Sequence, residues 1–224
     1  MHDLNSDIFI FDMSTLTVGV LALQGAFIEH VLFLRQAIAE LNSELSANII
    51  EVRTAKQLET CNALVIPGGE STVMSLIAER TDMLEPLRQF VQDPAKPVWG
   101  TCAGLIFIGS KVVNGRKDQK LLNAMDIEVT RNAFGRQLDS KIVSLDFSSF
   151  IPGLTSFPAT FIRAPVVSEV GENVEILSKL EDSGFVVAVK QGNKLGTSFH
   201  PELSESNAFH KYFLEQYVLK RYSA

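Results

Sequence analysis

The sequence predicts a single α/β domain with a mixed, mostly parallel sheet. The first half alternates short, continuous apolar runs with segments of helical periodicity, which is typical of parallel strands covered on both faces by helices. The second half instead contains several short strand-like segments, with a hairpin turn at residues 191–193. A chain of 224 residues that is 46% hydrophobic is enough for one domain with a sizeable core.

The composition excludes several classes of protein. No apolar run approaches the roughly 20 residues of a membrane helix, and the acidic residues 1–7 argue against a targeting peptide. The net charge is −6 with no dense Lys/Arg cluster, so we expect neither nucleic-acid nor membrane binding. The two cysteines, Cys61 and Cys102, do not make a disulfide framework and fit a cytoplasmic protein.

In the first half, we expect residues 1–17 to be an N-terminal extension and residues 18–224 to form the domain. Short apolar runs predict buried strands at residues 18–23, 49–52, 63–66 and 98–99. Helices are expected between these strands at about residues 27–41, from the capping-box spacing at 54–57, from about 72, at about 82–92 and directly after residue 102.

In the second half, apolar and β-branched segments predict strands rather than alternating strands and helices. The expected strands lie at residues 126–131, 141–147, 159–163, 174–178, 185–190 and 194–199. Phe209, Phe213 and Tyr217 recur at steps of four and predict a last helix at about 206–221.

Cys102 lies in the run WGTCAG (residues 99–104), between an apolar strand and the apolar start of a helix. This is the pattern of a nucleophile elbow, Gly-x-nucleophile-x-Gly. A thiolate at this turn would face the helix N-terminus, whose N–H groups favour negative charge. Taken alone, Cys102 also fits a small buried hydrophobe, because a cysteine nucleophile needs a base elsewhere in the chain.

His200 and Glu202 lie in the run GTSFHPE (residues 196–202). In an extended segment, residues i and i+2 point to the same side, so Glu202 would hold the ring of His200. The other ring nitrogen would then be left to take a proton from a thiol, as in acyl-transfer enzymes. The alternative is a loop histidine beside a solvated glutamate, which is a common arrangement.

Three loops fall at the carboxyl ends of the predicted parallel strands, where open α/β sheets bind ligands: residues 24–25, 68–71 and 101–103. His200 ends the last strand of the hairpin and would share this edge. The convergence of a nucleophile, a base and glycine loops favours catalysis.

An amide attacked by Cys102 would need N–H donors for its oxyanion. The glycine pair Gly68-Gly69 offers backbone that approaches a substrate closely. The N–H of Gly69 or Gly68, together with that of Ala103, would form the oxyanion hole. A plain turn after a strand is the alternative for this glycine pair.

Six runs together resemble, in order, the glutaminase subunit of pyridoxal 5′-phosphate synthase, a branch of the class I (triad) glutamine amidotransferases. The resemblance extends from about residue 18 to the C-terminus. Its elbow and its His-Pro-Glu run are shared by many class I amidotransferases, whereas RNAFGRQ and FIRAP are specific to the vitamin B6 branch. The runs are LALQGAFIEH (21–30), PGGEST (67–72), GTCAGL (100–105), RNAFGRQ (131–137), FIRAP (161–165) and SFHPEL (198–203).

The resemblance implies a single three-layer, flavodoxin-like domain with Cys102 as nucleophile, His200 as base and Glu202 as its orienter. A thioester would form and then be hydrolysed. It also implies that L-glutamine is bound by residues with donors and acceptors for its α-carboxylate and α-ammonium groups. These residues are Gly69, Glu70, Ser71, Arg131, Ile162 and Arg163. Without the resemblance, Arg131 and Arg163 fit solvated or structural arginines.

The resemblance further implies a partner, a (β/α)₈-barrel synthase subunit that receives ammonia directly and makes pyridoxal 5′-phosphate. The loop around Gln24 would meet this subunit and help set the oxyanion hole; a polar helix cap is the alternative role for Gln24. We expect no metal or organic cofactor, because the chain has four histidines and no Cys/His cluster with ligand spacing.

The chain departs from the family pattern in three places. Residues 1–17 are extra, Ser140 is followed by Lys141 where a Ser-Phe pair is common, and residues 115–120 replace a more glycine-rich loop. These departures concern partner fit rather than the triad. Three alternative functions remain: the glutaminase of another amidotransferase, a free γ-glutamyl hydrolase, and a non-catalytic regulatory subunit.

Overall fold

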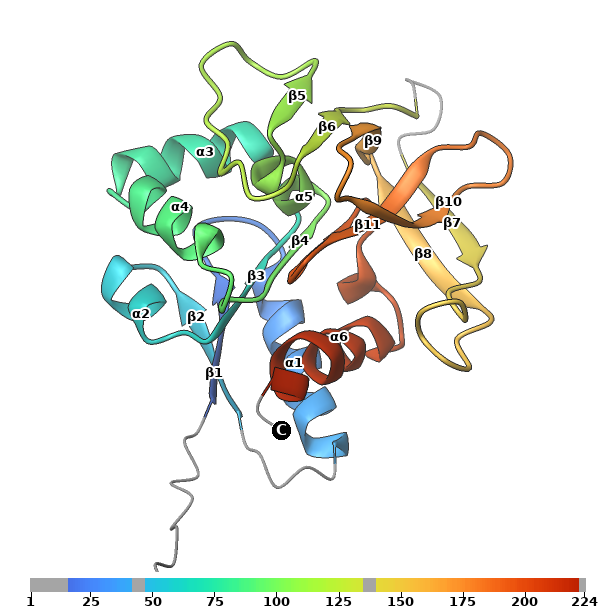
Figure 1. Ribbon diagram of the computed structural model, residues 1–224, viewed down its shortest axis with the longest axis horizontal. Coiled ribbons are helices and arrows are strands. Elements are labelled where there is room, and N and C mark those ends of the chain that lie inside the picture. The colour runs from blue at the N-terminus through green and yellow to red at the C-terminus, as the bar shows by residue number, and fades with distance from the viewer. Residues whose placement is uncertain (1–15, 42–46, 135–139, 222–224) are drawn as a thin grey trace, which may run out of the picture.

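The computed structural model describes residues 16–41, 47–134 and 140–221. Within them, ten strands form one twisted sheet in the order β2-β1-β3-β4-β12-β11-β9-β6-β5, with β10 beside β11 (Figure 1). The first five strands of this order are parallel: β2 (Ala47–Val52), β1 (Leu16–Leu21), β3 (Ala63–Ile66), β4 (Val98–Thr101) and β12 (Lys194–Thr197).

The other strands make the sheet mixed. β11 (Val186–Gln191) runs antiparallel to β12, and β9 (Val166–Val170) runs antiparallel to both β11 and β6 (Ile127–Thr130). β5 (Lys111–Val113) is parallel to β6, and β10 (Glu175–Lys179) is antiparallel to β11. A separate hairpin of β7 (Ser140–Leu145) and β8 (Phe157–Ile162) forms a second sheet beside the main one.

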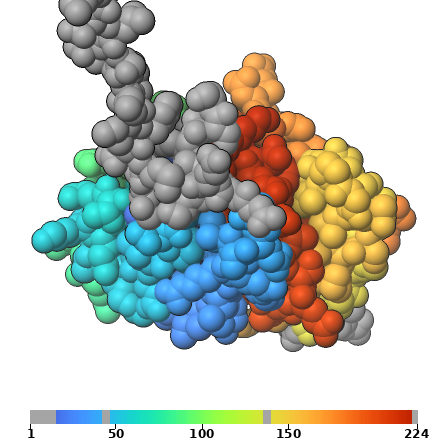
Figure 2. Space-filling view, turned by 90° about the horizontal axis from the view of Figure 1, so that it is seen from below, coloured from blue at the N-terminus to red at the C-terminus, as the bar shows by residue number. Residues whose placement is uncertain are grey.

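Helices cover both faces of the parallel part, giving the three layers expected from the sequence (Figure 1). α1 (Phe27–Glu40) and α6 (Ala208–Phe213) lie on one face, side by side in blue and red in Figure 2. The other face carries α2 (Ala55–Glu59), α3 (Ser71–Arg80), α4 (Leu84–Gln92) and α5 (Ala103–Ile108). The capping box predicted for α2 is confirmed, with the Thr54 side chain accepting from the Gln57 N–H.

Alternation along β1 divides the apolar interior into two cores. Val18 and Val20 point toward α1 and pack with Val31 and Leu34, whereas Leu21 belongs to the core under α2–α5. Both faces of the strand are therefore buried, as its continuous apolar run predicts.

A phenylalanine cluster attaches the β7–β8 hairpin to α6. The ring of Phe209 on α6 lies 4.9 Å from Phe147, 5.0 Å from Phe157 and 5.1 Å from Phe199, each measured between ring centroids. Phe199 immediately precedes His200, so this packing fixes the backbone that leads to the candidate base.

Several boundaries differ from the sequence predictions. β1 begins at Leu16 rather than residue 18, so two residues of the expected extension belong to the sheet; residues 1–15 lie outside the described residues. The predicted strand 194–199 ends at Thr197. β5 and β9 were not predicted, because β5 has only three residues and β9 turns polar after two valines, so neither shows a clear period.

The predicted last helix at 206–221 is continuous but not uniformly α-helical. α6 gives way to a π-helical turn at Leu214–Val218 and a 3-10 turn at Leu219–Arg221. Aromatic spacing of four residues does not distinguish these closely related turns. In the described part of the chain, each helix is too short or too polar to cross a membrane.

Candidate active site

The Cys102 turn has the geometry of a nucleophile elbow. β4 ends at Thr101, α5 begins at Ala103, and Cys102 between them has φ 48° and ψ −103°. A non-glycine residue in this region is strained, and such strain is concentrated at functional sites. Cys102 is 6% exposed, and both it and Cys61 are free thiols.

The glycines on either side of Cys102 are required by close packing. A Cβ on Gly104 would collide with the backbone carbonyl of Ile66 on β3, and a Cβ on Gly100 would collide with the carbonyl of Gly104. Only glycine lets the strand, the turn and the helix approach this closely. The Gly-x-Cys-x-Gly spacing in the sequence therefore reports a real backbone constraint.

Strand register brings His200 to Cys102. In the parallel pair β4–β12, Thr101 lies beside Thr197, so both chains leave the sheet at the same edge. The Cys102 N–H donates to the Thr197 carbonyl at 2.8 Å. Beyond the sheet, the His200 N–H donates to the carbonyl of Thr160 on β8 at 2.8 Å, so the second sheet also holds the base.

His200 lies beside Cys102 and is hydrogen-bonded to Glu202. His200 Nδ1 lies 2.7 Å from Glu202 Oε1, and the His200 ring and the Cys102 side chain both face Gly68 in the same cleft. Since Glu202 is 4% exposed and ionised, it can only accept, so Nδ1 carries the proton and Nε2 is left for the thiol. Glu202 lies on a 3-10 turn, Pro201–Leu203, and His200 is the N-cap of this turn, so the pair does not lie on one extended segment as expected from the sequence. Proline at the first position of this turn favours helical over extended backbone.

The electrostatics of this arrangement favour a charged His200. Burial by itself lowers the pKa of His200, but its hydrogen bonds to Cys102 and Glu202 and their negative charges raise it to about 10. Burial opposes ionisation of Glu202, yet His30 and His200 hold the pKa of this carboxyl well below its usual range. At neutral pH the site therefore contains an imidazolium between a carboxylate and the candidate nucleophile.

The glycine pair after β3 lies directly against the triad. A Cβ on Gly68 would overlap the His200 ring and approach Cys102, so this position requires glycine. The Gly68 carbonyl accepts from the Ala26 N–H at 3.2 Å. Ala103 is the first residue of α5, so its N–H has no partner within the helix and is available at the elbow.

Gln24 is tied to the same loop. Its Oε1 accepts from the Glu70 N–H at 3.0 Å, and its side chain also lines the cleft in front of Cys102. The alternative role, a polar cap of α1, is wrong: the N-cap of α1 is Ala26, and no side chain caps it.

A cleft of about 360 Å³ opens in front of Cys102 and His200. All six residues expected to bind substrate line it, and they come from the β3–α3 loop, the end of β6 and the end of β8. The expected residues in the lining are Gly69, Glu70, Ser71, Arg131, Ile162 and Arg163. The last three residues of the RNAFGRQ run, 135–137, lie outside the described residues.

The charged groups of the cleft differ in their partners. Glu70 caps α3 by accepting from the Thr72 and Val73 N–H groups at 3.1 and 2.7 Å, and it pairs with Arg131 at 2.8 Å. Burial opposes ionisation of Glu70, but these N–H groups and Arg131 outweigh it and lower its pKa. Arg163 is exposed, and among the described residues its guanidinium has no hydrogen-bond or ion-pair partner.

Sequence reasoning missed three lining residues, Ile106, Asn132 and Pro165. Asn132 and Arg163 both have positive φ, at 51° and 41°, and the Ala133 N–H donates to the Ala164 carbonyl to join their loops. Asparagine tolerates this backbone region, so Asn132 carried a weak signal. Arg163 carried no such signal, because arginine does not favour backbone with positive φ.

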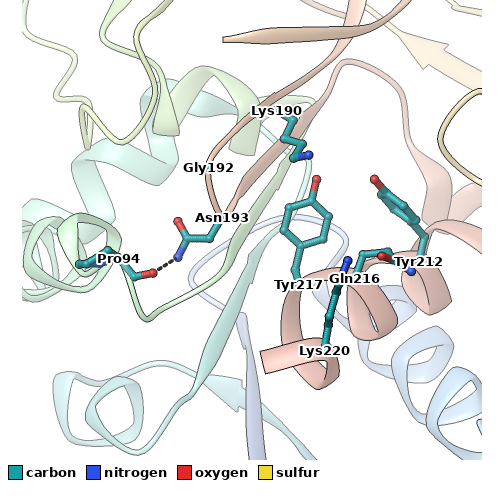
Figure 3. A pocket seen from close by; sticks show the side chains of 8 residues that line it. All are labelled: Pro94, Lys190, Gly192, Asn193, Tyr212, Gln216, Tyr217 and Lys220. Atoms are coloured by element: carbon teal, nitrogen blue, oxygen red, sulfur yellow. Dashed lines mark hydrogen bonds between the residues drawn. The ribbon is translucent and has the colours of Figure 1, made fainter. Parts of the chain in front are cut away.

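A second hollow lies at the opposite end of β4 and β12. It measures about 490 Å³ and is lined by residues that precede these strands or lie on the C-terminal helix, among them Asn193 and Tyr217 (Figure 3). The Asn193 side chain donates to the Pro94 carbonyl at 2.9 Å across it. It contains none of the candidate catalytic residues, so the chemistry lies at the carboxyl edge, as expected for an open α/β sheet. No cluster of three or more His, Cys, Asp or Glu side chains suited to a metal ion occurs in the residues that the structure describes.

Comparison with known proteins places the whole domain in one family. The profile of the SNO glutamine amidotransferase family matches residues 20–219. The chain belongs to this family. It is 51% identical over 220 residues to a Saccharomyces cerevisiae protein named probable pyridoxal 5′-phosphate synthase subunit SNO3, covering 93% of this chain and 99% of that protein.

A bacterial relative and a solved structure agree with this assignment. The Corynebacterium jeikeium pyridoxal 5′-phosphate synthase subunit PdxT is 51% identical over 197 residues, covering 88% of this chain and 94% of its own. A crystal structure of a glutamine amidotransferase superposes with a TM-score of 0.74 at 42% identity, covering 88% of this chain and 97% of that chain. The predicted fold and the predicted enzyme class, a glutamine amidotransferase, are therefore confirmed.

Proposed function

We propose that this amidotransferase hydrolyses L-glutamine to L-glutamate through Cys102, His200 and Glu202. The observation that carries the proposal is the placement of Cys102 beside His200 in one cleft, with His200 Nδ1 hydrogen-bonded to Glu202. Nucleophile, base and orienter in hydrogen-bond reach are what covalent amide hydrolysis requires.

The reaction follows from this arrangement. The Cys102 thiolate attacks the side-chain amide carbon, and its oxyanion is met by N–H groups of Ala103 and of Gly68 or Gly69. The imidazolium of His200 gives its proton to the leaving nitrogen, which departs as ammonia and leaves a γ-glutamyl thioester. His200 then takes a proton from water as the water attacks the thioester, and glutamate is released.

The lining of the cleft supports an α-amino acid as the substrate. Arg163 offers a guanidinium without a partner in the described chain for the α-carboxylate, and the Glu70 carboxylate suits the α-ammonium. Ser71 and Ile162 complete the walls. Arg131 acts through Glu70, which it holds by an ion pair.

The ammonia acceptor follows from the family. Relatives are named as subunits of pyridoxal 5′-phosphate synthase, so we propose that ammonia passes to a barrel-type synthase subunit docked near Gln24. Gln24 joins the cleft to the loop of Gly69 and Glu70, which supports a role in partner-dependent setting of the oxyanion hole. The free thiols fit action in a reducing cytoplasm.

The test is glutamate release from glutamine by the purified chain, with and without a barrel-type synthase subunit, using Cys102→Ala as the blank. Release that rises when the barrel subunit is added supports the whole proposal. Equal release in both conditions contradicts the proposed synthase partner and supports a free hydrolase. No release in either condition contradicts the catalytic assignment.

A further inference from the structure

A buried polar chain continues behind the triad, on the side of Glu202 away from the cleft. His30 of α1 and His210 of α6 are both fully buried, and neither is in contact with the cleft. His30 Nε2 lies 3.3 Å from Glu202 Oε2 and 3.2 Å from Thr101 Oγ1. His30 Nδ1 lies 2.8 Å from His210 Nε2.

The hydrogen position on His30 Nε2 follows from Glu202. The ionised carboxylate can only accept, so His30 Nε2 carries a proton and is aimed at Glu202 and Thr101. His30 Nδ1 and His210 Nε2 share a second hydrogen bond at the other side of the His30 ring. Burial, with His30 as a second cause, lowers the pKa of His210 well below its usual value, so His210 is neutral.

Glu202 needs this support because its second oxygen is buried. Oε1 is bound by His200, whereas Oε2 has no well-aligned hydrogen bond among the described residues, and His30 Nε2 is the basic group facing it. A buried carboxylate oxygen without a donor is costly, and it lets the carboxylate rotate. Within the described residues, the ionisable groups in contact with His30 are Glu202 and His210.

We propose that His30 is a positioning residue of the triad, which holds the second carboxylate oxygen of Glu202 and keeps this residue oriented on His200, while His210 holds the other ring nitrogen of His30. The proposal deepens the proposed glutaminase function and rests on it. Because Thr101 directly precedes Cys102, the same ring also contacts the strand that carries the nucleophile.

The experiment compares three variants in a Cys61→Ala background, which leaves Cys102 as the single thiol. His30→Leu removes the donor, and His30→Gln keeps an N–H group. Val31→Ala is the matched control, because Val31 is the next residue of α1, is 4% exposed, and belongs to the apolar core. The loss of stability in Val31→Ala shows the effect of a purely structural change on α1.

Two readouts need no substrate. The first is the downfield proton resonance of His200 Nδ1–H in ¹⁵N-histidine-labelled protein, assigned with His200→Asn. The second is the rate of Cys102 alkylation by iodoacetamide as a function of pH. His30→Leu is expected to shift or lose the resonance and move the alkylation midpoint to higher pH, since a loosened Glu202 stabilises the imidazolium less. His30→Gln restores both toward the parent, and Val31→Ala leaves both unchanged.

The third readout is glutamine hydrolysis with the barrel subunit present. His30→Leu is expected to lower kcat by about 10- to 100-fold, with KM within about 2-fold, because the loss is in orientation of the base and not in substrate binding. If His30→Leu behaves like Val31→Ala in the resonance and in alkylation, the proposal is overturned. If His30→Leu does not fold, His30→Asn, whose amide does not reach Glu202, is compared with His30→Gln in the same way.

The substrate-free readouts separate the two proposals. A parent protein that fails to hydrolyse glutamine, while His30→Leu still shifts the His200 resonance, defeats the proposed function and supports the positioning of Glu202. A parent protein that hydrolyses glutamine, while His30→Leu matches Val31→Ala in all three readouts, defeats the positioning role alone.

Discussion

The two halves of the domain contribute to the active site by different physical means. In the half from β1 to α5, backbone geometry sets the site: Cys102 has its strained φ, and Gly100, Gly104 and Gly68 are required by close approach. In the half from β5 to the C-terminal helix, side-chain contacts set it, with His200 held by Glu202 and by packing of Phe199. The two halves meet where β4 pairs with β12. Catalysis requires both halves, because Cys102 follows β4 and His200 follows β12.

The largest expected effect comes from the backbone-defined half. Cys102→Ala removes the thiol while the turn keeps a small side chain, so glutamine hydrolysis should fall by roughly 10⁴-fold or more. Glutamate release and thermal unfolding followed by circular dichroism measure activity and folding separately. Activity within 10-fold of the parent would show that another group is the nucleophile.

The second effect probes the side-chain half. Glu202→Gln keeps the shape but provides an amide, which no longer fixes the protonated Nδ1 of His200, so kcat should fall by roughly 10²- to 10⁴-fold. The matched control is Glu205→Gln, a carboxylate three residues further along that is not part of the described triad. Equal activity of the two variants would remove Glu202 from the mechanism.

The same variant has a pH signature in stability. The pKa of His200 is raised from 6.5 to about 10, so its stabilisation is fully present below pH 6.5 and is lost as pH rises toward 10. The pKa of Glu202 is lowered from 4.5, so its stabilisation is present above pH 4.5 and is lost as pH falls. The difference in free energy of unfolding between parent and Glu202→Gln, from urea titrations, should be largest at about pH 4.5–6.5 and shrink on both sides. A difference independent of pH would contradict the ion-pair account.

The third effect is a difference in the free energy of unfolding between two glycine substitutions, one in each half. Gly104→Ala would place a Cβ on the Ile66 carbonyl and should cost about 1–3 kcal/mol or more. Gly184→Ala in the second half meets no atom within 4 Å, so it should cost only the strain of its φ of 69°, about 1–2 kcal/mol. Urea denaturation measures both variants, and a Gly104→Ala cost below that of Gly184→Ala would contradict the close-approach argument.

The smallest expected effect concerns substrate binding. Arg163→Gln should raise KM for glutamine by about 10-fold with kcat little changed, since loss of one charge-assisted contact is worth about 1–2 kcal/mol. Arg116→Gln, on an exposed loop where Arg116 pairs with Asp118, is the matched control. A lowered kcat at unchanged KM would assign Arg163 to the chemical step instead.

The two halves also differ in how much the sequence alone predicts. Continuous apolar runs mark β1 and β3, and the glycines around Cys102 mark the elbow, because each of these features leaves a short, recognisable pattern in the sequence. β9 and the 3-10 turn after His200 were missed, because antiparallel pairing with distant strands and Pro201 determine them. The site residues of the second half, Arg131, Ile162 and Arg163, were named from family resemblance.

The buried histidines could not be found from the sequence for a related reason. His30 and His210 are 180 residues apart, and only the packing of α1 against α6 brings them together behind Glu202. His30 lies in a family run and on a helical face, where a buried histidine carries no separate signal.

The central claim is that Cys102, presented by one half, attacks glutamine with help from His200 of the other half. The most direct test is acid quenching of the enzyme during turnover of isotopically labelled glutamine with the barrel subunit present, followed by peptide mass spectrometry. The account predicts a γ-glutamyl adduct on the Cys102 peptide and none on the Cys61 peptide, whose buried thiol has a pKa raised to about 11. Glutamate release without any adduct on Cys102, or an adduct on Cys61, would contradict it.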